Sequence, residues 1–352
     1  MRDYWLIAAL ALASWHCGSE AEQAAIDDVG ASTDTASEAG DSAVPDQAVQ
    51  EVDGPEFDAE PLDAPADAHG EVATPAWVPT GTGPWFGALF VAISTDGLNF
   101  GAGELLLERA GVPNTLKTPD GTVILTYQYF SYASESDFNV IAASISTDEG
   151  ETWQGPTVIT IDGLPSGSPA VDPSLVRLAN GRLRLYFTFH PHGAPNPVCA
   201  SAIGDSVEQA FQYEGTRITH ASEALLDPAV VEFKGLWHYY TWRTVMPGGP
   251  LSDNYHAVSS DGLSFGALDT ISLGMSFLGN PIVVGDSLRF YGTGRGGVLS
   301  ASSTNGVAWT LDAGVRIEGM AAEGAPIPLA DGRMRLIYTA RMPGAPARTP
   351  PR

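Results

Sequence analysis

Three acidic side chains stand where segments with the pattern of β-strands begin. Asp172 and Asp227 directly precede a proline, and Glu323 stands three residues before one. Carboxyl groups that a fold brings together can act as general acid and general base in one reaction. The structural alternative is that an acidic residue before a proline only accepts hydrogen bonds from nearby backbone N–H groups.

Other polar residues are candidates for contacts with a ligand. Asn280 also precedes a proline, and Arg295 lies between glycines that leave it room to approach a ligand carboxylate, although a solvated loop arginine has the same pattern. His190 and His192 flank a proline and have no third metal ligand nearby in the sequence. We therefore expect no metal and no cofactor, and we keep Asn280, Arg295 and His190 as substrate-binding candidates. Cys199 is expected to be a buried free thiol.

The acidic residues belong to an internal repeat. Five short segments end in Pro113, Pro173, Pro228, Pro281 and Pro326, which are 60, 55, 53 and 45 residues apart. Each is followed by a turn containing glycine and by an alternating, aromatic-rich strand, as in residues 182–189. Repeats of this length, each with several strands, indicate the blades of an all-β propeller. Trp85, Tyr129, Trp237 and Trp242 either pack between such sheets or stack on sugars.

A second repeated feature is a strand that runs into a Ser/Thr-Asp-Gly turn followed by an aromatic residue. The clearest copies cover residues 146–153, 259–265 and 302–309, and another covers residues 92–100, before the first proline segment. The last repeat has only two strands before the chain ends. We therefore predict five blades, with the N-terminal strands completing the last blade.

These repeats resemble known propellers. The turns are similar to the Asp-box of sialidases, and the Asp-Pro segments around Asp172 and Asp227 are similar to the five-bladed glycoside hydrolases of the arabinanase, β-xylosidase, levansucrase and invertase group. In that group one carboxylate acts as base or nucleophile, one protonates the leaving oxygen and a third tunes the acid. The arabinanase branch takes them from the first, third and fourth blades, where this chain has Val112, Asp227 and Asn280.

Moving the roles by one blade restores a possible pair of reacting groups. The segment around Glu323 resembles the family's acid segment but lies one blade later. The resemblance then implies Glu323 as acid and Asp172 as base, with Asp227 between them raising the pKa of the acid by like-charge repulsion.

The N-terminal region is predicted to be a targeting signal followed by a linker, and not part of the folded domain. Residues 4–15 form an apolar run too short to span a membrane, and Cys17 follows it, which resembles a lipoprotein signal. Cleavage by ordinary signal peptidase is the alternative. Residues 18–75 contain 16 acidic residues and no Lys or Arg, as expected of a disordered spacer. The predicted boundaries are a signal peptide (1–16), a linker (17–76), a propeller (77–341) and a disordered tail (342–352).

The net charge and the predicted targeting signal limit the classes of function that the protein can have. Acidic residues outnumber Lys and Arg by 42 to 17, which disfavours nucleic-acid binding. We expect a monomer on a bacterial outer membrane or cell surface, held to the membrane only by lipid on Cys17. Two functions remain open: an inverting glycoside hydrolase acting on extracellular poly- or oligosaccharide, and a surface propeller that binds glycan or protein without turnover.

Overall fold

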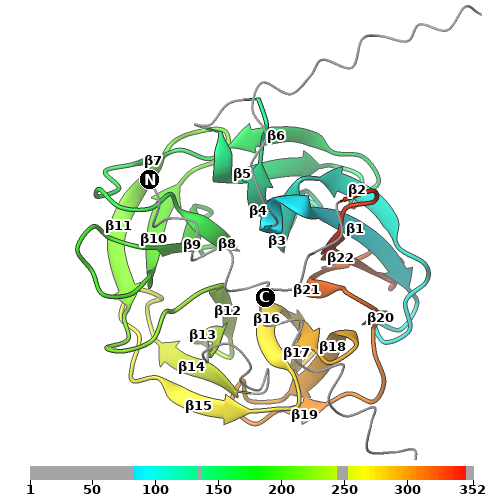
Figure 1. Cartoon of the computed structure of the whole chain (residues 1–352). Helices are drawn as coiled ribbons and strands as arrows, with labels where there is room; N and C mark the ends of the chain where they lie inside the picture. The colour runs from blue at the N-terminus through cyan, green and yellow to red at the C-terminus, as the bar shows by residue number, and fades with distance from the viewer. Residues whose placement is uncertain (1–82, 134–136, 244–252, 346–352) are drawn as a thin grey trace, which may run out of the picture. The chain divides into compact units, whose positions relative to one another are not determined.

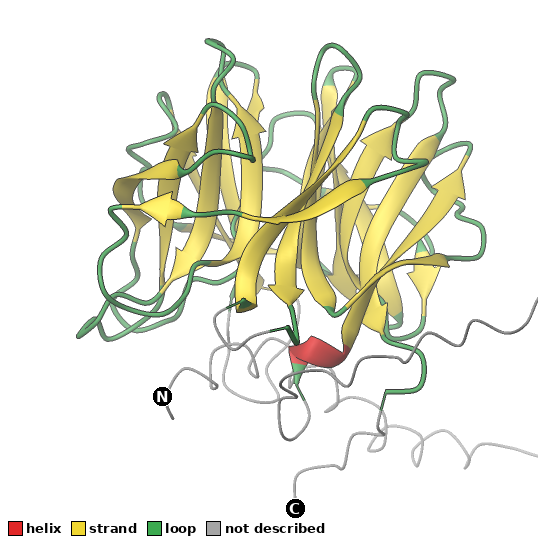
Figure 2. Cartoon of the chain, turned by 90° about the horizontal axis from the view of Figure 1, so that it is seen from above, coloured by secondary structure: helices red, strands yellow, loops and turns green. Residues whose placement is uncertain are grey.

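The computed structural model describes residues 83–133, 137–243 and 253–345. Within these ranges the strands form five separate sheets arranged in a ring (Figure 1), and the helical structure is one 3-10 turn, η2 (Pro84–Phe86). The predicted five-bladed all-β propeller is therefore confirmed. Seen edge-on in Figure 2, the strands run roughly parallel to one another, and η2 lies at one end of them.

Four blades are continuous in sequence. Each begins with its innermost strand, except blade 2, in which the short outermost strand β7 comes first. Blade 1 contains β3 (Ala110–Lys117), β4 (Val123–Phe130), β5 (Phe138–Ser146) and β6 (Gln154–Val158). Blade 2 contains β7 (Ile161–Asp162), β8 (Val171–Arg177), β9 (Leu183–Phe189), β10 (Val198–Gly204) and β11 (Phe211–Ile218). Blade 3 contains β12 (Ala229–Phe233), β13 (Leu236–Trp242), β14 (Asp253–Ser259) and β15 (Asp269–Ser272). Blade 4 contains β16 (Ser276–Val284), β17 (Ser287–Gly294), β18 (Gly297–Ser303), β19 (Thr310–Leu311) and β20 (Ile317–Glu318).

The fifth blade combines the two ends of the propeller. Its sheet order is β2 (Glu104–Glu108), β1 (Gly87–Ser94), β22 (Met334–Arg341) and β21 (Ala322–Pro328). The antiparallel pairing of β1 with β22 runs without interruption from Gly87 opposite Arg341 to Ser94 opposite Met334. The predicted completion of the last blade by N-terminal strands is thus confirmed, and ring closure depends on this pairing.

Aromatic residues on the second strand of each blade form much of the core. Tyr127, Tyr186, Tyr239, Tyr240 and Tyr291 are all fully buried. A buried tyrosine needs a partner for its hydroxyl. Three of these hydroxyls donate to a glycine carbonyl of the next blade, at 2.6 to 2.8 Å: Tyr186 to Gly262, Tyr240 to Gly306 and Tyr291 to Gly97. The core aromatics therefore join neighbouring sheets as well as filling the space between them.

The three glycines belong to turns that follow the third strand of a blade, which we call the Ser-Asp turns. Their Ser and Asp (or Asn) positions are Ser94 and Asp96, Ser146 and Asp148, Ser259 and Asp261, and Ser303 and Asn305. In the turn of Asp96, one carboxylate oxygen accepts the N–H groups of Leu98 and Asn99, both at 2.8 Å. Asp261 accepts two N–H groups in the same way. The aspartate thus satisfies backbone donors that the tight turn leaves unpaired.

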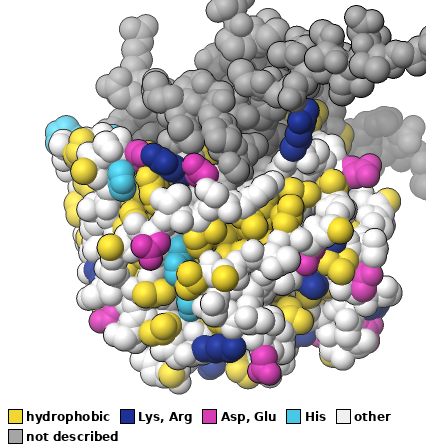
Figure 3. Space-filling model, turned by 90° about the horizontal axis from the view of Figure 1, so that it is seen from below, with side chains coloured by type: hydrophobic (Ala, Val, Ile, Leu, Met, Phe, Trp, Pro, Cys, Tyr) yellow, Lys and Arg dark blue, Asp and Glu magenta, His cyan; other side chains and the backbone are white. Residues whose placement is uncertain are grey.

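The outer strands expose some apolar surface. Figure 3 shows apolar side chains gathered on one side of the propeller, with charged side chains scattered among them. Val258 on β14 and Leu311 on β19 are exposed members of the outer strands of blades 3 and 4. In the described ranges no helix has the length and apolar character needed to cross a membrane.

Candidate active site

The innermost strands share a backbone irregularity near their beginnings. Val112, Asp172, Asp227 and Glu323 have φ angles of 50°, 54°, 51° and 60°. In blades 1, 2 and 5 the pairing of the innermost strand with its neighbour skips two residues at this point. A residue that leaves the pairing in a left-handed conformation no longer follows the alternation of its strand, so a bulge can re-aim its side chain. This conformation is unfavourable for any residue except glycine, and most of all for β-branched Val112.

Glu323 is held by groups from its own blade and from blade 1. Its Oε2 accepts the Val112 backbone N–H at 2.7 Å and the Thr339 hydroxyl at 2.5 Å. Its backbone N–H donates to the Thr293 hydroxyl of blade 4 at 3.1 Å. The unfavourable conformation of Val112 therefore positions an N–H group for the carboxylate of the neighbouring blade.

Asp227 and Asp172 meet between blades 2 and 3. The Asp227 backbone N–H donates to the Thr188 hydroxyl at 3.1 Å and, more weakly, to Asp172 Oδ2 at 3.4 Å. The indole N–H of Trp242 donates to Asp227 Oδ2 at 2.8 Å. Asp227 Oδ1 is buried and has no hydrogen-bond partner. Asp227 thus has one oxygen fixed by the protein and one oxygen that the protein leaves unbonded.

All three acidic residues, which we call the carboxyl cluster, lie away from solvent. Asp172, Asp227 and Glu323 are 7%, 4% and 5% exposed. Burial raises the pKa of Asp172 to about 6, against hydrogen bonds from Thr188 and the Asp227 N–H. Burial raises the pKa of Glu323 to about 7, with hydrogen bonds from Thr339 and Val112 opposing the rise and the charge of Asp172 adding to it. Carboxyls with such pKa values can exchange protons near neutral pH.

The pKa of Asp227 is also raised, well above its ordinary range. Burial is the main cause, and the charges of Asp172 and Glu323 add to it, while the bond from Trp242 opposes it. The predicted repulsion between Asp227 and Glu323 acts on both groups, because each charge disfavours the ionised form of the other, and the charge of Asp172 acts on both of them as well.

Asn280 does not occupy the position that the repeat suggested. In blade 4 the pairing skips three residues instead of two, so Asn280 lies level with Asn114 rather than with Val112. Its Nδ2 donates to the carbonyls of Pro113 and Gly324, and its Oδ1 accepts from Asn114 Nδ2 at 2.7 Å. Asn280 therefore connects blades 4, 5 and 1, and its amide already has protein partners on both ends.

The other predicted candidates lie on loops or inside the core. His190 follows β9, and its Nε2 contacts the carbonyl of Ala194 in the same loop at 2.9 Å. Arg295 is exposed in the turn between β17 and β18. Both loops follow the second strand of a blade. In blade 3 the second strand ends at Trp242, which contacts Asp227, so the two loops lie at the same end of the ring as the carboxyl cluster. Trp85, Trp237 and Trp242 are buried, which leaves them no open face for a sugar. Cys199 is a buried free thiol, as expected.

The residues described include no group of three or more His, Cys, Asp or Glu side chains placed to hold a metal ion. No described cation pairs with the carboxyl cluster either, because the ion pairs formed between described residues lie elsewhere. Without a cation, the buried cluster has less to stabilise its ionised forms, which is why protonation is the expected response to burial.

Reasoning from sequence missed the groups that hold the cluster. These are the Val112 N–H, the indole of Trp242 and three threonine hydroxyls. A signal for the threonines was present, since the second strands of four blades carry, close to their last residue, a threonine flanked by aromatic or small residues: Thr188, Thr241, Thr293 and Thr339.

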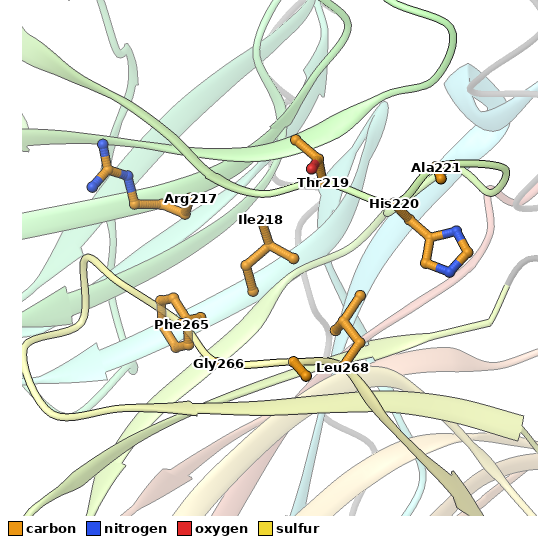
Figure 4. A pocket seen from close by; sticks show the side chains of 9 residues that line it. Arg217, Ile218, Thr219, His220, Ala221, Phe265, Gly266 and Leu268 are labelled. Carbon is orange, nitrogen blue, oxygen red and sulfur yellow. The ribbon is translucent and has the colours of Figure 1, made fainter.

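A surface pocket of about 480 Å³ lies elsewhere, between blades 2 and 3 (Figure 4). Its lining comes from the end of β11 with the loop after it, which contributes Arg217 and His220, and from the segment after the Ser-Asp turn of blade 3, which contributes Phe265. The Arg217 guanidinium donates to the backbone carbonyls of Gly215, Glu214 and Leu263. Because these elements are the outer parts of their blades, the pocket is separate from the carboxyl cluster and adds no acid or base to it.

Comparison with known proteins identifies the architecture. No family model and no curated protein matches the chain. Solved structures do match. A β-1,3-galactosidase described as a family-43 glycoside hydrolase has a TM-score of 0.50 at 11% identity, over 67% of this chain and 91% of that one. The exo-β-1,3-galactanase of Phanerochaete chrysosporium has a TM-score of 0.50 at 10% identity, over 72% of this chain and 64% of that one. An α-L-arabinofuranosidase from Clostridium thermocellum has a TM-score of 0.43 at 16% identity, over 58% of this chain and 71% of that one. This chain shares the fold of the galactosidase and the galactanase. At such identities the likeness extends to the five-bladed propeller and no further.

Proposed function

We propose that the propeller hydrolyses glycosidic bonds at the carboxyl cluster. The observation that carries the proposal is that buried carboxyls from three blades interact: the Asp227 N–H donates to Asp172, the charge of Glu323 acts on Asp227, and no described cation lies beside them. Burial raises the pKa values of all three. Glycoside hydrolysis needs one carboxyl that is protonated and one that is ionised, on either side of the bond to be broken.

Glu323 is a reacting group in either arrangement that the ring allows. It lies in blade 5, two blades from Asp172 in blade 2 and two blades from Asp227 in blade 3, whereas the two aspartates are in adjacent blades. In one arrangement Glu323 is the acid and Asp172 the base, as the family resemblance implies. In the other, Glu323 is the base and Asp227 the acid. Groups two blades apart leave more room for a water molecule than neighbours do, so we expect inversion.

The test is turnover by the full-length protein on arabinan, xylan, fructan, galactan and aryl glycosides. Product stereochemistry is followed by proton NMR during the first minutes. We expect hydrolysis with inverted product and its loss in Glu323→Gln. Absence of hydrolysis on every substrate would reject the enzymatic proposal.

The second candidate function is glycan binding without turnover. It is favoured by the low exposure of the carboxyl cluster and by the amide of Asn280, which is already bonded within the protein. This function predicts that glycan arrays retain signal with no reducing sugar released, and that Glu323→Gln binds as well as the parent protein.

The proposed location is the bacterial cell surface, with lipid on Cys17, which lies outside the described residues. The apolar run before Cys17 and the acidic segment after it support this proposal. We expect the mature protein to fractionate with membranes, and Cys17→Ser to be released or left unprocessed. Mass spectrometry showing cleavage elsewhere and no acyl groups would contradict lipidation.

A further inference from the structure

The two arrangements of reacting groups differ in which aspartate works with Glu323. If Asp172 works with it, Asp172 must be ionised when substrate binds and Glu323 must be protonated. If Asp227 works with it, Asp227 must be protonated and Glu323 ionised. The hydrogen bonds around each carboxyl decide between these states.

The surroundings of Asp227 suit a neutral carboxylic acid. An ionised carboxylate accepts several hydrogen bonds, and burying one with an unbonded oxygen is costly. Asp227 accepts one hydrogen bond, from Trp242 to Oδ2, and its Oδ1 is buried without a partner. Glu323, by contrast, accepts the Val112 N–H and the Thr339 hydroxyl on one oxygen. The protein therefore supplies donors to Glu323 and withholds them from Asp227 Oδ1.

The titratable groups around Asp227 also favour its protonated form. Asp172 on β8 and Glu323 on β21 both disfavour its charge, and the remaining titratable neighbour on β13 is the buried hydroxyl of Tyr239. No histidine, lysine or arginine of the described ranges contributes to its ionisation. Of three carboxyls that repel one another, the one with fewest donors keeps its proton longest.

We propose that Asp227 is the general acid of this site, that Glu323 is the base paired with it, and that Trp242 is the positioning residue that fixes Asp227 through its indole N–H. The inference rests on the proposed function. Asp172 then becomes the neighbouring charge that acts on both reacting groups, because it raises the pKa of Asp227 and of Glu323.

The step balances with one water molecule. Asp227 gives its proton to the glycosidic oxygen as the bond from that oxygen to the anomeric carbon breaks, and the bonding electron pair stays on the oxygen. The leaving sugar departs as a neutral alcohol. Water forms the new bond to the anomeric carbon and gives one proton to Glu323. Release of that proton to solvent and uptake of one by Asp227 restore the starting state.

Substrates with different leaving groups identify the acid. A dinitrophenyl leaving group departs without protonation, whereas an alkyl or sugar leaving group requires an acid. We expect Asp227→Asn to lose about 10²–10⁴-fold in kcat on natural glycosides and little on the dinitrophenyl glycoside. Glu323→Gln should lose activity on both. The reverse pattern, with Glu323→Gln spared on the activated substrate, would overturn the proposal and assign the acid role to Glu323.

The pH profile tests Trp242. Its hydrogen bond stabilises the ionised form of Asp227, so Trp242→Phe should move the alkaline limb of kcat to higher pH, by about half a pH unit to one unit. Trp237→Phe is the matched control, because Trp237 is a buried tryptophan of the same strand that packs in the core between blades 2 and 3. An alkaline limb that stays in place in Trp242→Phe, or that moves equally in both variants, would refute the positioning role.

Infrared spectroscopy separates this inference from the proposed function. At neutral pH the parent protein should show the carbonyl band of a protonated carboxyl that disappears in Asp227→Asn. If no glycoside is hydrolysed but the band is present, the hydrolase proposal fails and the protonated state of Asp227 is supported. If hydrolysis occurs and the band is absent, the hydrolase proposal stands and the role of Asp227 as acid is overturned.

Discussion

The aspartates of the Ser-Asp turns and those of the carboxyl cluster lie in the same propeller and ionise in opposite ways. Asp148 and Asp261 are exposed, and hydrogen bonds within their turns lower their pKa values to about 2. The main contributors are the Thr152 hydroxyl for Asp148 and the N–H groups of Ser264 and Leu263 for Asp261. Asp172 and Asp227 are buried with few donors, and their pKa values rise.

The difference separates the structural role of the turns from the catalytic role that we propose for the carboxyl cluster. A carboxylate that gains donors on folding favours the folded state at neutral pH, and one that loses its hydration opposes it. The turns therefore use aspartate to stabilise the blade, whereas the carboxyl cluster reduces stability. Clustering of strained, buried and mutually repelling groups at one end of the innermost strands is the pattern expected of a functional site.

The largest effect should come from removing the strands that both regions share. A chain ending at Ala321 lacks β21 and β22, so it loses Glu323 and leaves β1, which leads into the Asp96 turn, paired only with β2. We expect loss of cooperative thermal unfolding, because the ring is open and β1 has become an unprotected edge. Circular dichroism melting measures this. A sharp transition near that of the full chain would show that closure by β1 and β22 is dispensable.

The next largest effect should come from Glu323, whose ionisation in a buried site lowers the free energy of unfolding. The folded-state pKa of Glu323 is about 7, above its unfolded value of 4.5, so the folded state binds more protons between these values and stability falls as pH rises through that window. Glu323→Gln removes this loss. Its unfolding free energy should match that of the parent protein near pH 4.5 and exceed it by about 3 kcal/mol above pH 7.

Urea unfolding at a series of pH values measures the difference between the two proteins. The pH dependence of groups that do not interact with Glu323 cancels in this difference. That includes the buried pair His238 and His256, whose lowered pKa values make the folded state less stable in acid. A difference that is constant with pH would show that Glu323 is ionised as easily in the folded protein as in the unfolded chain.

The sequence predicts the Ser-Asp turns better than the carboxyl cluster, because the turns depend on local contacts and the cluster depends on contacts between blades. The blades, the split last blade and the Ser-Asp turns depend on local patterns, such as the turn of Ser146 and Asp148, whose partners lie within four residues. The contacts of the carboxyl cluster depend on register across blades. One extra unpaired residue in blade 4 moves Asn280 out of the predicted position, and the Val112 N–H reaches a glutamate 211 residues away. Neither could be read from spacing alone.

A smaller effect is expected from one hydroxyl of the site. Thr339 donates to Glu323 Oε2 and lowers its pKa. Thr339→Val keeps the shape of the side chain and removes the donor, so the pKa of Glu323 should rise further, by up to about one unit. The pH at which stability begins to fall should stay near the unfolded pKa, while the pH at which the fall ends should move upward. The same urea series reports this, and an end point at unchanged pH would show that the hydroxyl does not act on Glu323.

The smallest effect should come from a single Ser-Asp turn, and its pH dependence has the opposite sign. The folded-state pKa of Asp148 is about 2, below its unfolded value of 3.8, so its stabilising contribution is present above pH 3.8 and is lost as pH falls toward 2. Asp148→Ala should lower Tm slightly at pH 7 and have no effect near pH 2. Asp148→Asn, which keeps an oxygen acceptor for the Thr152 N–H, should lower it less. If Asp148→Ala instead raises Tm at neutral pH, as Glu323→Gln is expected to do, the two regions use their carboxylates in the same way and the division between a stabilising and a destabilising set is wrong.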